Sequence, residues 1–113
     1  MHEYSIASAL LRMAEEHAHK HDATHVVDLH IRVGELSGVE VSLLETAWSL
    51  VRAGSLCEGV DLSIVRVAAH WTCRDCQASL DRGGLLVCQT CGGRVVLSTG
   101  DDLVLDRIEM EVA

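Results

Sequence analysis

The chain has 113 residues, a formal net charge of −8 and a hydrophobic fraction of 49%. This length fits one compact domain, or one domain with a small appendage. The nine basic residues are scattered among seventeen acidic ones, whereas nucleic-acid binders cluster Lys and Arg to neutralise phosphates. We therefore expect a protein partner or a cation rather than a nucleic acid.

The composition also argues against a membrane protein. No apolar run is long enough to cross a bilayer, so no membrane association is expected. The chain opens with charged and polar residues and lacks the apolar segment of an export signal. A cytoplasmic location is the expectation.

The first 33 residues predict a helix followed by a strand. Apolar residues recur with a period near 3.6 from about 4 to 20, which is typical of a helix with one buried stripe. The expected stripe is Ile6, Leu10, Met13, Ala14 and Ala18. Apolar and polar residues then alternate from 26 to 33, which indicates a half-buried strand. Its expected inner face is Val27, Leu29, Ile31 and Val33.

A loop framed by Gly34 and Gly38 leads to a second helix. Ser42 and Glu45 match a capping box, in which each side chain accepts a hydrogen bond from a free amide at the helix start. Gly54 suits a left-handed helix end. Alternation then predicts a second strand over 60–67.

The end of the chain predicts a last strand over about 103–112. Val104, Ile108, Met110 and Val112 are expected to share one face. Asp106 breaks this alternation, which predicts a bulge or an edge position at that residue.

Four cysteines form two Cys-x-x-Cys pairs with eleven residues between the pairs, Cys73 with Cys76 and Cys88 with Cys91. Two thiolates on a tight turn can hold one side of a tetrahedral ion, and a second turn across a short hairpin closes the other side. Gly92 and Gly93 offer backbone that turns without a Cβ clash. Because four protein thiolates leave no open position, we expect a structural zinc site.

Two disulfides or a redox dithiol are the alternatives to zinc. Nothing in the chain suggests export, where disulfides persist. A redox motif would be a single pair that opens a helix after a strand. Cys57 stands alone and is interpreted as a half-buried apolar residue.

These elements predict an α+β fold with a small mixed sheet of about three strands, two helices and an inserted four-cysteine zinc-ribbon subdomain. The α/β domain would comprise residues 1–69 and 98–113. The zinc-ribbon domain would comprise residues 70–97, inserted between two strands.

The segment Met1-His2-Glu3 is a second cluster of metal donors. The terminal amine, the following backbone amides and the imidazole are nitrogens linked closely through the chain. Ni(II) and Cu(II) can displace amide protons and accept four donors in a square plane. A solvated histidine without a metal explains the same residue.

Other histidines can also be interpreted either as metal ligands or as ordinary polar residues. His17 and His21 are four residues apart on the first helix, a spacing that can chelate one metal, and His19 and His25 lie nearby. Cations at a helix C-terminus are also favoured by the helix dipole, which explains the same residues without a metal. His30 and His70 are interpreted as strand or linker residues without an assigned role.

Together these motifs resemble the HypA/HybF family of hydrogenase nickel-incorporation proteins. The matching segments follow one another along the chain: Met1-His2-Glu3-x-Ser5, Val33-Gly34-Glu35-Leu36-Ser37-Gly38-Val39-Glu40, the two cysteine pairs, Gly100-Asp101-Asp102-Leu103 and Ile108-Glu109-Met110-Glu111. Gln89 stands where many members carry proline, and Trp48 stands where the family often carries Phe. Neither departure removes a ligand.

The resemblance implies a nickel metallochaperone, not an enzyme. Members pass Ni(II), as cargo, toward the active site of nickel–iron hydrogenase, together with the GTPase HypB. The implied partners are a HypB-type GTPase and the precursor of the hydrogenase large subunit. Urease accessory proteins and a second copy of the chain, in a homodimer, are further candidates.

The resemblance also implies the ligands. His2, with Met1 and Glu3, would hold nickel, and Cys73, Cys76, Cys88 and Cys91 would hold structural Zn(II). Glu40 is a candidate to reach the nickel ion, although an exposed charge before the second helix is the plainer interpretation.

Two rival functions remain from the sequence. The first is a zinc-ribbon interaction adaptor without a nickel role. The second is an enzyme such as a zinc hydrolase, which requires an open metal position or a paired acid and base that the sequence does not offer.

Overall fold

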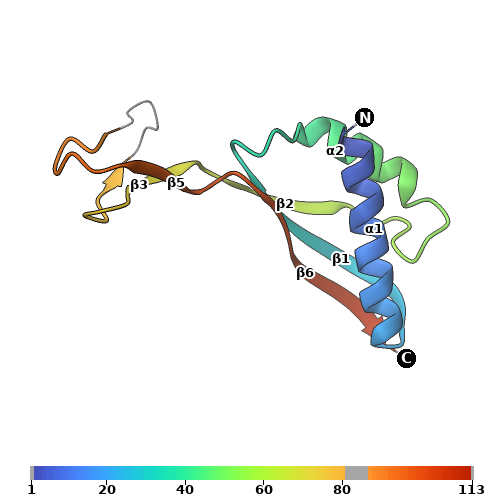
Figure 1. Ribbon diagram of the computed structural model, residues 1–113. Helices are drawn as coiled ribbons and strands as arrows, with labels where there is room; N and C mark the ends of the chain where they lie inside the picture. Colours follow the sequence, from blue (N-terminus) through green and yellow to red (C-terminus); the bar gives the residue numbers. More distant parts are fainter. Residues whose placement is uncertain (1, 81–86, 113) are drawn as a thin grey trace.

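The computed structural model describes residues 2–80 and 87–112. The molecule is elongated, with extents of 56 × 28 × 16 Å. A sheet covered by two helices forms one end, and a smaller second sheet extends from it (Figure 1). The residues around the cysteines therefore lie far from the helices.

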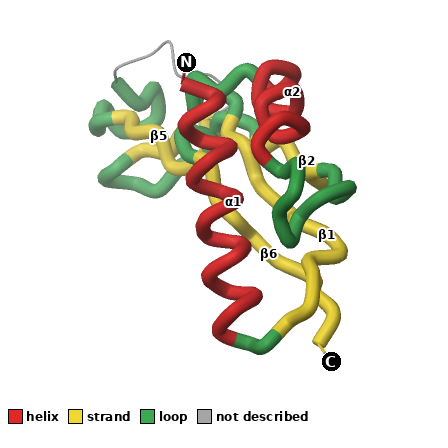
Figure 2. The backbone as a smooth tube through the Cα atoms, turned by 90° about the vertical axis from the view of Figure 1, so that its right-hand side faces the viewer, coloured by secondary structure: helices red, strands yellow, loops and turns green. Residues whose placement is uncertain are grey.

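The larger sheet contains three strands: β1 (Ala23–Gly34), β2 (Leu62–Val67) and β6 (Leu103–Val112). Their order is β2-β1-β6, with β1 and β2 parallel and β1 and β6 antiparallel. The helices α1 (His2–Lys20) and α2 (Val41–Val51) pack against each other on one face of this sheet (Figure 2). The expected mixed sheet with two helices is confirmed.

The core lies between the helices and the sheet. Its largest fully buried side chains are Trp48, Leu29, Ile31 and Leu44. The Trp48 Nε1 donates a hydrogen bond to the Val60 carbonyl at 2.6 Å, so the polar edge of this ring is satisfied inside the core. Within the described residues no helix is long and apolar enough to cross a membrane.

The buried stripe of α1 differs from the expected one at two positions: Ala7 rather than Ile6 is fully buried, and Met13 is exposed. Ala7, Leu10, Ala14 and Ala18 are buried, whereas Met13 is 39% exposed. Ala7, Leu10, Ala14 and Ala18 follow the spacing of three or four residues that one face of a helix requires. The small alanines let α1 lie close to the sheet, and Met13 falls at the margin of that contact.

The inner face of β1 also differs from the expected one. Val26 is buried and Val27 is 49% exposed, the reverse of a strict alternation through Leu29, Ile31 and Val33. The pairing with β6 shifts between Val26 and Asp28, so Val27 is an extra residue on this strand. Such a bulge changes which residues face the core on one side of it.

A second bulge lies at Asp106, as the sequence predicts. His30 pairs with Arg107 and Ile31 pairs with Leu105, which leaves Asp106 unpaired on β6. Leu103 and Leu105 therefore join Ile108 on the core side. The expectation that Val104 shares this face is wrong, since the side chain is 42% exposed.

The start of α2 also corrects the sequence prediction. The helix begins at Val41 with Glu40 as its N-cap, and the Glu40 side chain makes no capping hydrogen bond. The expected capping box of Ser42 and Glu45 does not form because Ser42 is already inside the helix. Its hydroxyl instead donates to Glu40 Oε1 at 3.3 Å.

The second sheet is built from β3 (His70–Cys73), β4 (Ser79–Leu80) and β5 (Val95–Thr99), in the order β4-β3-β5. The chain enters it directly from β2 and returns from it to β6, as the sequence predicts. Gly34 N donates to Asp102 O at 2.8 Å, and Leu36 N donates to Gly100 O at 2.7 Å. The loop after β1 thus contacts the returning segment at the junction of the two sheets.

Candidate metal sites

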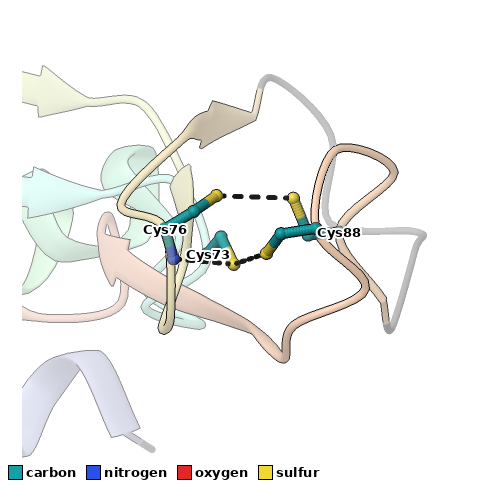
Figure 3. A group of neighbouring side chains, drawn as sticks. Cys73, Cys76 and Cys88 are labelled. Carbon is teal, nitrogen blue, oxygen red and sulfur yellow. Dashed lines mark hydrogen bonds between the residues drawn. The ribbon is translucent and has the colours of Figure 1, made fainter.

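Cys73, Cys76 and Cys88 point toward one another beside the second sheet (Figure 3), and Cys91 completes the group. The Sγ atoms of Cys73 and Cys91 are 3.4 Å apart, and those of Cys76 and Cys88 are 3.8 Å apart. All four sulfurs lie within 4.8 Å of one another. Sulfurs bound about 2.3 Å from one tetrahedral zinc ion lie about 3.8 Å from each other. The donor set and its spacing therefore suit a closed zinc site.

The two cysteine turns have the same backbone geometry. Gln77 N donates to Cys73 O at 3.0 Å, and Gly92 N donates to Cys88 O at 2.8 Å. Gln77 and Gly92, each four residues after the first cysteine of its turn, have positive φ values of 66° and 76°. A glycine suits this conformation, so the second turn adopts it without the cost that Gln77 imposes on the first.

Gly93 is needed for a different reason. A Cβ at this position would lie 2.8 Å from Cys73 Sγ and 2.5 Å from Asp75 Oδ2. The second turn can therefore approach the first only because Gly93 has no side chain. The expectation that both glycines serve the turn is confirmed.

The backbone also favours the thiolate form at the first cysteine of each turn. The N–H groups of Cys91 and Thr90 donate to Cys88 and lower the pKa of its thiol to about 6. Hydrogen bonds from the Cys76 and Asp75 N–H groups likewise lower the pKa of Cys73. The neighbouring Cys73 raises the pKa of Cys91 to about 12. Four simultaneous thiolates thus require a cation, whose binding releases protons.

The N-terminal candidates lie at the other end of the molecule. His2 is exposed and is the first residue of α1, whereas the sequence predicted a helix from about residue 4. Glu3 is only 9% exposed, although it lies in the first turn of this helix. Met1 lies outside the described residues. The His2-Glu3 part of the candidate segment is therefore helical.

Glu3 and Glu40 are brought together by the fold. The N–H of Glu40 donates to Glu3 Oε2 at 3.0 Å. This hydrogen bond is the main reason that the pKa of Glu3 lies below its ordinary value, followed by a hydrogen bond from the backbone N–H of Glu3 itself. The side chain of Glu40 is exposed beside this contact. The loop before α2 therefore adjoins the first turn of α1.

An open apolar groove lies beside this contact. Tyr4 and Leu43 line it, and both side chains are about half exposed. The remaining lining residues are Glu3, Ser5, Thr46, Ala47 and Leu50. The first turn of α1 is thus accessible from this side.

Cys57 and the histidines near the end of α1 do not join these sites. Cys57 is fully buried rather than half-buried, and burial raises the pKa of its thiol to about 11. His17 and His21 are exposed beside β6. In the described part of the chain they belong to no group of three His, Cys, Asp or Glu donors.

A third group of donors was missed by the sequence analysis. Asp28, His30 and Glu109 offer three ligand atoms within 4.8 Å of one another. Asp28 and His30 alternate onto one face of β1, which the sequence pattern indicates. Glu109 joins them only through the register between β1 and β6, which the sequence does not give.

The comparisons with known proteins agree with this architecture. A family model described as "Hydrogenase/urease nickel incorporation, metallochaperone, hypA" matches residues 1–110. A hydrogenase maturation factor HypA from Shewanella baltica is 39% identical to this chain over 113 residues, which cover 98% of this chain and 97% of the relative.

Two solved structures have the same fold. The solution structure of the Ni metallochaperone HypA from Helicobacter pylori is 31% identical, with a TM-score of 0.73 and 98% of each chain covered. A second solution structure, of a HypA protein, is 32% identical, with a TM-score of 0.81 over 100% of this chain and 98% of that chain. The shared fold extends over both sheets.

Proposed function

This chain belongs to the HypA family of metallochaperones for hydrogenase maturation, which are not enzymes, and we propose that it binds Ni(II) at Met1-His2-Glu3. The ion is cargo that is passed on for insertion into nickel–iron hydrogenase. The observation that supports this site most directly is an exposed His2 at the very start of a helix.

A helix start supplies nitrogen atoms that nickel can use. The first four N–H groups of an α-helix have no partner within the helix. Ni(II) can displace amide protons and take nitrogen donors in a square plane. The backbone nitrogens of His2 and Glu3, together with the His2 imidazole, lie in this position on α1. They would form the nickel chelate with the terminal amine of Met1.

The Glu3 side chain would then orient the chelate rather than bind the ion. Its carboxylate already accepts the hydrogen bond from Glu40 N and is largely buried. Glu40 is the better candidate for a carboxylate ligand, because its side chain is exposed next to this contact. Its present hydrogen bond from Ser42, at 3.3 Å, is long and easily exchanged.

Release of the cargo would follow from the exposure of the site. A chelate at an exposed helix start leaves one side of the ion accessible, so the ligand atoms of a partner protein can approach it. The partners in this proposal are a HypB-type GTPase and the large-subunit precursor of hydrogenase, with urease accessory proteins as further recipients. Protons compete with nickel for imidazole and amine, so a lower pH would favour release.

Cys73, Cys76, Cys88 and Cys91 would hold zinc in a structural role. Four thiolates close the coordination sphere, so zinc would supply a cross-link between the two turns. Apparent binding free energies of such sites are about 10–16 kcal/mol in small zinc peptides. The second sheet would thereby form a rigid surface for a partner.

One loop connects the N-terminal site to the junction of the two sheets, which supports coupling between the N-terminus and the second sheet. Glu40, at the end of this loop, contacts Glu3. At its other end, Glu35 N donates to Val67 O, and Glu35 Oε1 accepts a hydrogen bond from Ala69 N at 2.7 Å. A shift at the N-terminus can therefore reach both segments that connect to the second sheet.

The proposal is tested by complementation in a strain that lacks its own copy of this chain. His2→Ala should fail to restore nickel to hydrogenase at limiting nickel, and excess nickel should restore it. The matched control is His19→Ala, which removes an exposed histidine from the other end of α1. Full activity of His2→Ala at limiting nickel would contradict the proposal and favour a nickel-independent adaptor.

A further inference from the structure

The outer face of the larger sheet holds a compact group of metal donors away from both sites above. Leu29 and Ile31 are buried under the helices, so Asp28 and His30, which alternate with them, lie on the opposite face of β1. Glu109 pairs directly with Asp28 from the neighbouring strand β6. The helices cover only the other face (Figure 2).

The three side chains converge on the Nε2 atom of His30. Glu109 Oε2 lies 2.6 Å from this nitrogen, and Asp28 Oδ2 lies 3.2 Å from it. We propose that Asp28, His30 and Glu109 bind a divalent first-row transition cation. One imidazole nitrogen and two carboxylate oxygens are donors that such ions accept, and they leave coordination positions for water.

The hydrogen bonding of His30 favours this proposal over a simple ion pair. Nε2 can hold either one proton or one lone pair. The Arg107 Nη2, 3.3 Å away, already has Glu109 Oε2 as an acceptor, so Nε2 is left with the two carboxylates. A protonated Nε2 can point its single N–H at only one of these oxygens, whereas a cation at the same point is coordinated by Nε2 and both carboxylates.

The carboxylate of Asp28 is oriented in advance. Its other oxygen, Oδ1, accepts hydrogen bonds from Ser63 Oγ and from Leu29 N, both at 2.8 Å. These bonds fix the plane of the carboxylate and direct Oδ2 toward His30. Supporting hydrogen bonds of this kind orient the ligands of metal sites in proteins.

Arg107 is the group that a cation must displace. Its Nη2 lies 3.3 Å from Glu109 Oε2 as well as from His30 Nε2. The Arg107 side chain is 65% exposed, so it can turn into solvent at little cost. Two carboxylates against one guanidinium leave a net negative charge that attracts a cation.

A neighbouring pair on the same two strands provides the matched control. His25 Nε2 lies 3.3 Å from Glu111 Oε2, with the same histidine–carboxylate chemistry. In the described part of the chain this pair belongs to no group of three donors. Removal of His25 should therefore leave cation binding unchanged.

The test is Ni(II) binding to the zinc-loaded protein in a His2→Ala background, measured by equilibrium dialysis. The inference does not depend on the N-terminal nickel site, which this background disables. We expect about one Ni(II) per chain, reduced tenfold or more in affinity by His30→Gln or Asp28→Asn and unchanged by His25→Gln. Arg107→Gln should strengthen binding, because it removes the competing cation.

Two further readouts distinguish this site from nickel bound at the cysteines and from a general loss of structure. Ni(II) bound to nitrogen and oxygen should give only weak d–d absorption, whereas nickel on the cysteines would give intense near-ultraviolet charge-transfer bands. Ser63→Ala should weaken binding about tenfold, because Asp28 loses its orienting hydrogen bond. Circular dichroism should confirm that every variant is folded. Equal nickel uptake by His30→Gln and its folded parent, or no uptake by the parent, would overturn the proposal.

Discussion

The carboxylate of Glu3 accepts a hydrogen bond from the backbone N–H of Glu40 at 3.0 Å. The bond joins the first turn of α1 to the residue that caps α2, and it is partly shielded from water. It fixes the proposed nickel-binding segment against the loop between β1 and α2, whose other end contacts the junction of the two sheets. The starts of the two helices, 37 residues apart in sequence, are thus held together.

This bond predicts a specific pH dependence of stability. The folded state lowers the pKa of Glu3 below 4.5, its ordinary value, chiefly through the Glu40 N–H. A carboxylate with a lowered pKa stabilises the folded state above its unfolded pKa and loses that contribution as pH falls through the folded value. Glu3→Gln should therefore be less stable than the parent at pH 7, with the difference shrinking below about pH 4.5.

The measurement is the difference in the free energy of unfolding between the two proteins from neutral to acid pH. Loss of zinc in acid affects both proteins and cancels in the difference. Glu16→Gln, a change at an exposed position on the same helix, should show no such trend. A difference that does not change with pH would argue against a charged Glu3 as the acceptor.

The first cysteine turn should be improved by a single substitution. Gln77 has a φ of 66°, which costs an L-residue about 1–2 kcal/mol, while a glycine costs about 0.5–1 kcal/mol in entropy. Gln77→Gly should therefore stabilise the zinc-loaded protein by up to about 1 kcal/mol. Gly92→Ala, at the equivalent position, should destabilise it by a similar amount. Chelator-driven zinc loss should be slower in the first variant and faster in the second, and the opposite order would contradict this account.

The junction of the two sheets should not tolerate a side chain at Gly34. A Cβ there would lie 2.4 Å from the backbone of Gly100. Overpacking of this kind costs about 1–3 kcal/mol. Gly34→Ala should lower stability and increase hydrogen exchange at the Leu36 amide, which bonds to Gly100 O. Gly54→Ala, where no atom lies within 4 Å and alanine is strained only by a φ of 74°, should lower stability without a selective increase in exchange at the Leu36 amide.

The two sheets should fold separately. The described core cluster contains only residues of the helices, the larger sheet and their connections. We therefore expect that a protein with residues 70–97 replaced by a short Gly-Ser linker keeps its helical circular dichroism and melts cooperatively. Chelators should not affect its melting temperature. An unfolded product would show that the ribbon is needed for the fold of the rest.

The sequence pattern predicted whether each main element is a helix or a strand better than it predicted which residues of that element face the core. The bulge at Asp106 follows from one acidic residue in an alternating strand. Its effect on Val104 could not be predicted in the same way, because a bulge reverses the face of every residue on one side of it. Val27 was misplaced for the same reason, since its apolar side chain gives no sign of an extra residue.

Long-range contacts account for the remaining differences between the sequence predictions and the structure. The capping box at Ser42 was a sound local pattern, but the N-cap is Glu40, two residues earlier, and its N–H is bound by Glu3. The four cysteines were found from spacing because their geometry is local to two turns. The group around His30 was not found because it needs the register of two strands that lie far apart in sequence.

The most direct test of the nickel site is a Ni(II) titration of the zinc-loaded protein with its native N-terminus, beside His2→Ala and a variant with extra residues before Met1. The proposed chelate uses the terminal amine, so the extension should abolish it even though His2 is still present. We expect the native protein to bind about one Ni(II) per chain more than either variant. Equal binding by all three proteins would contradict the N-terminal site.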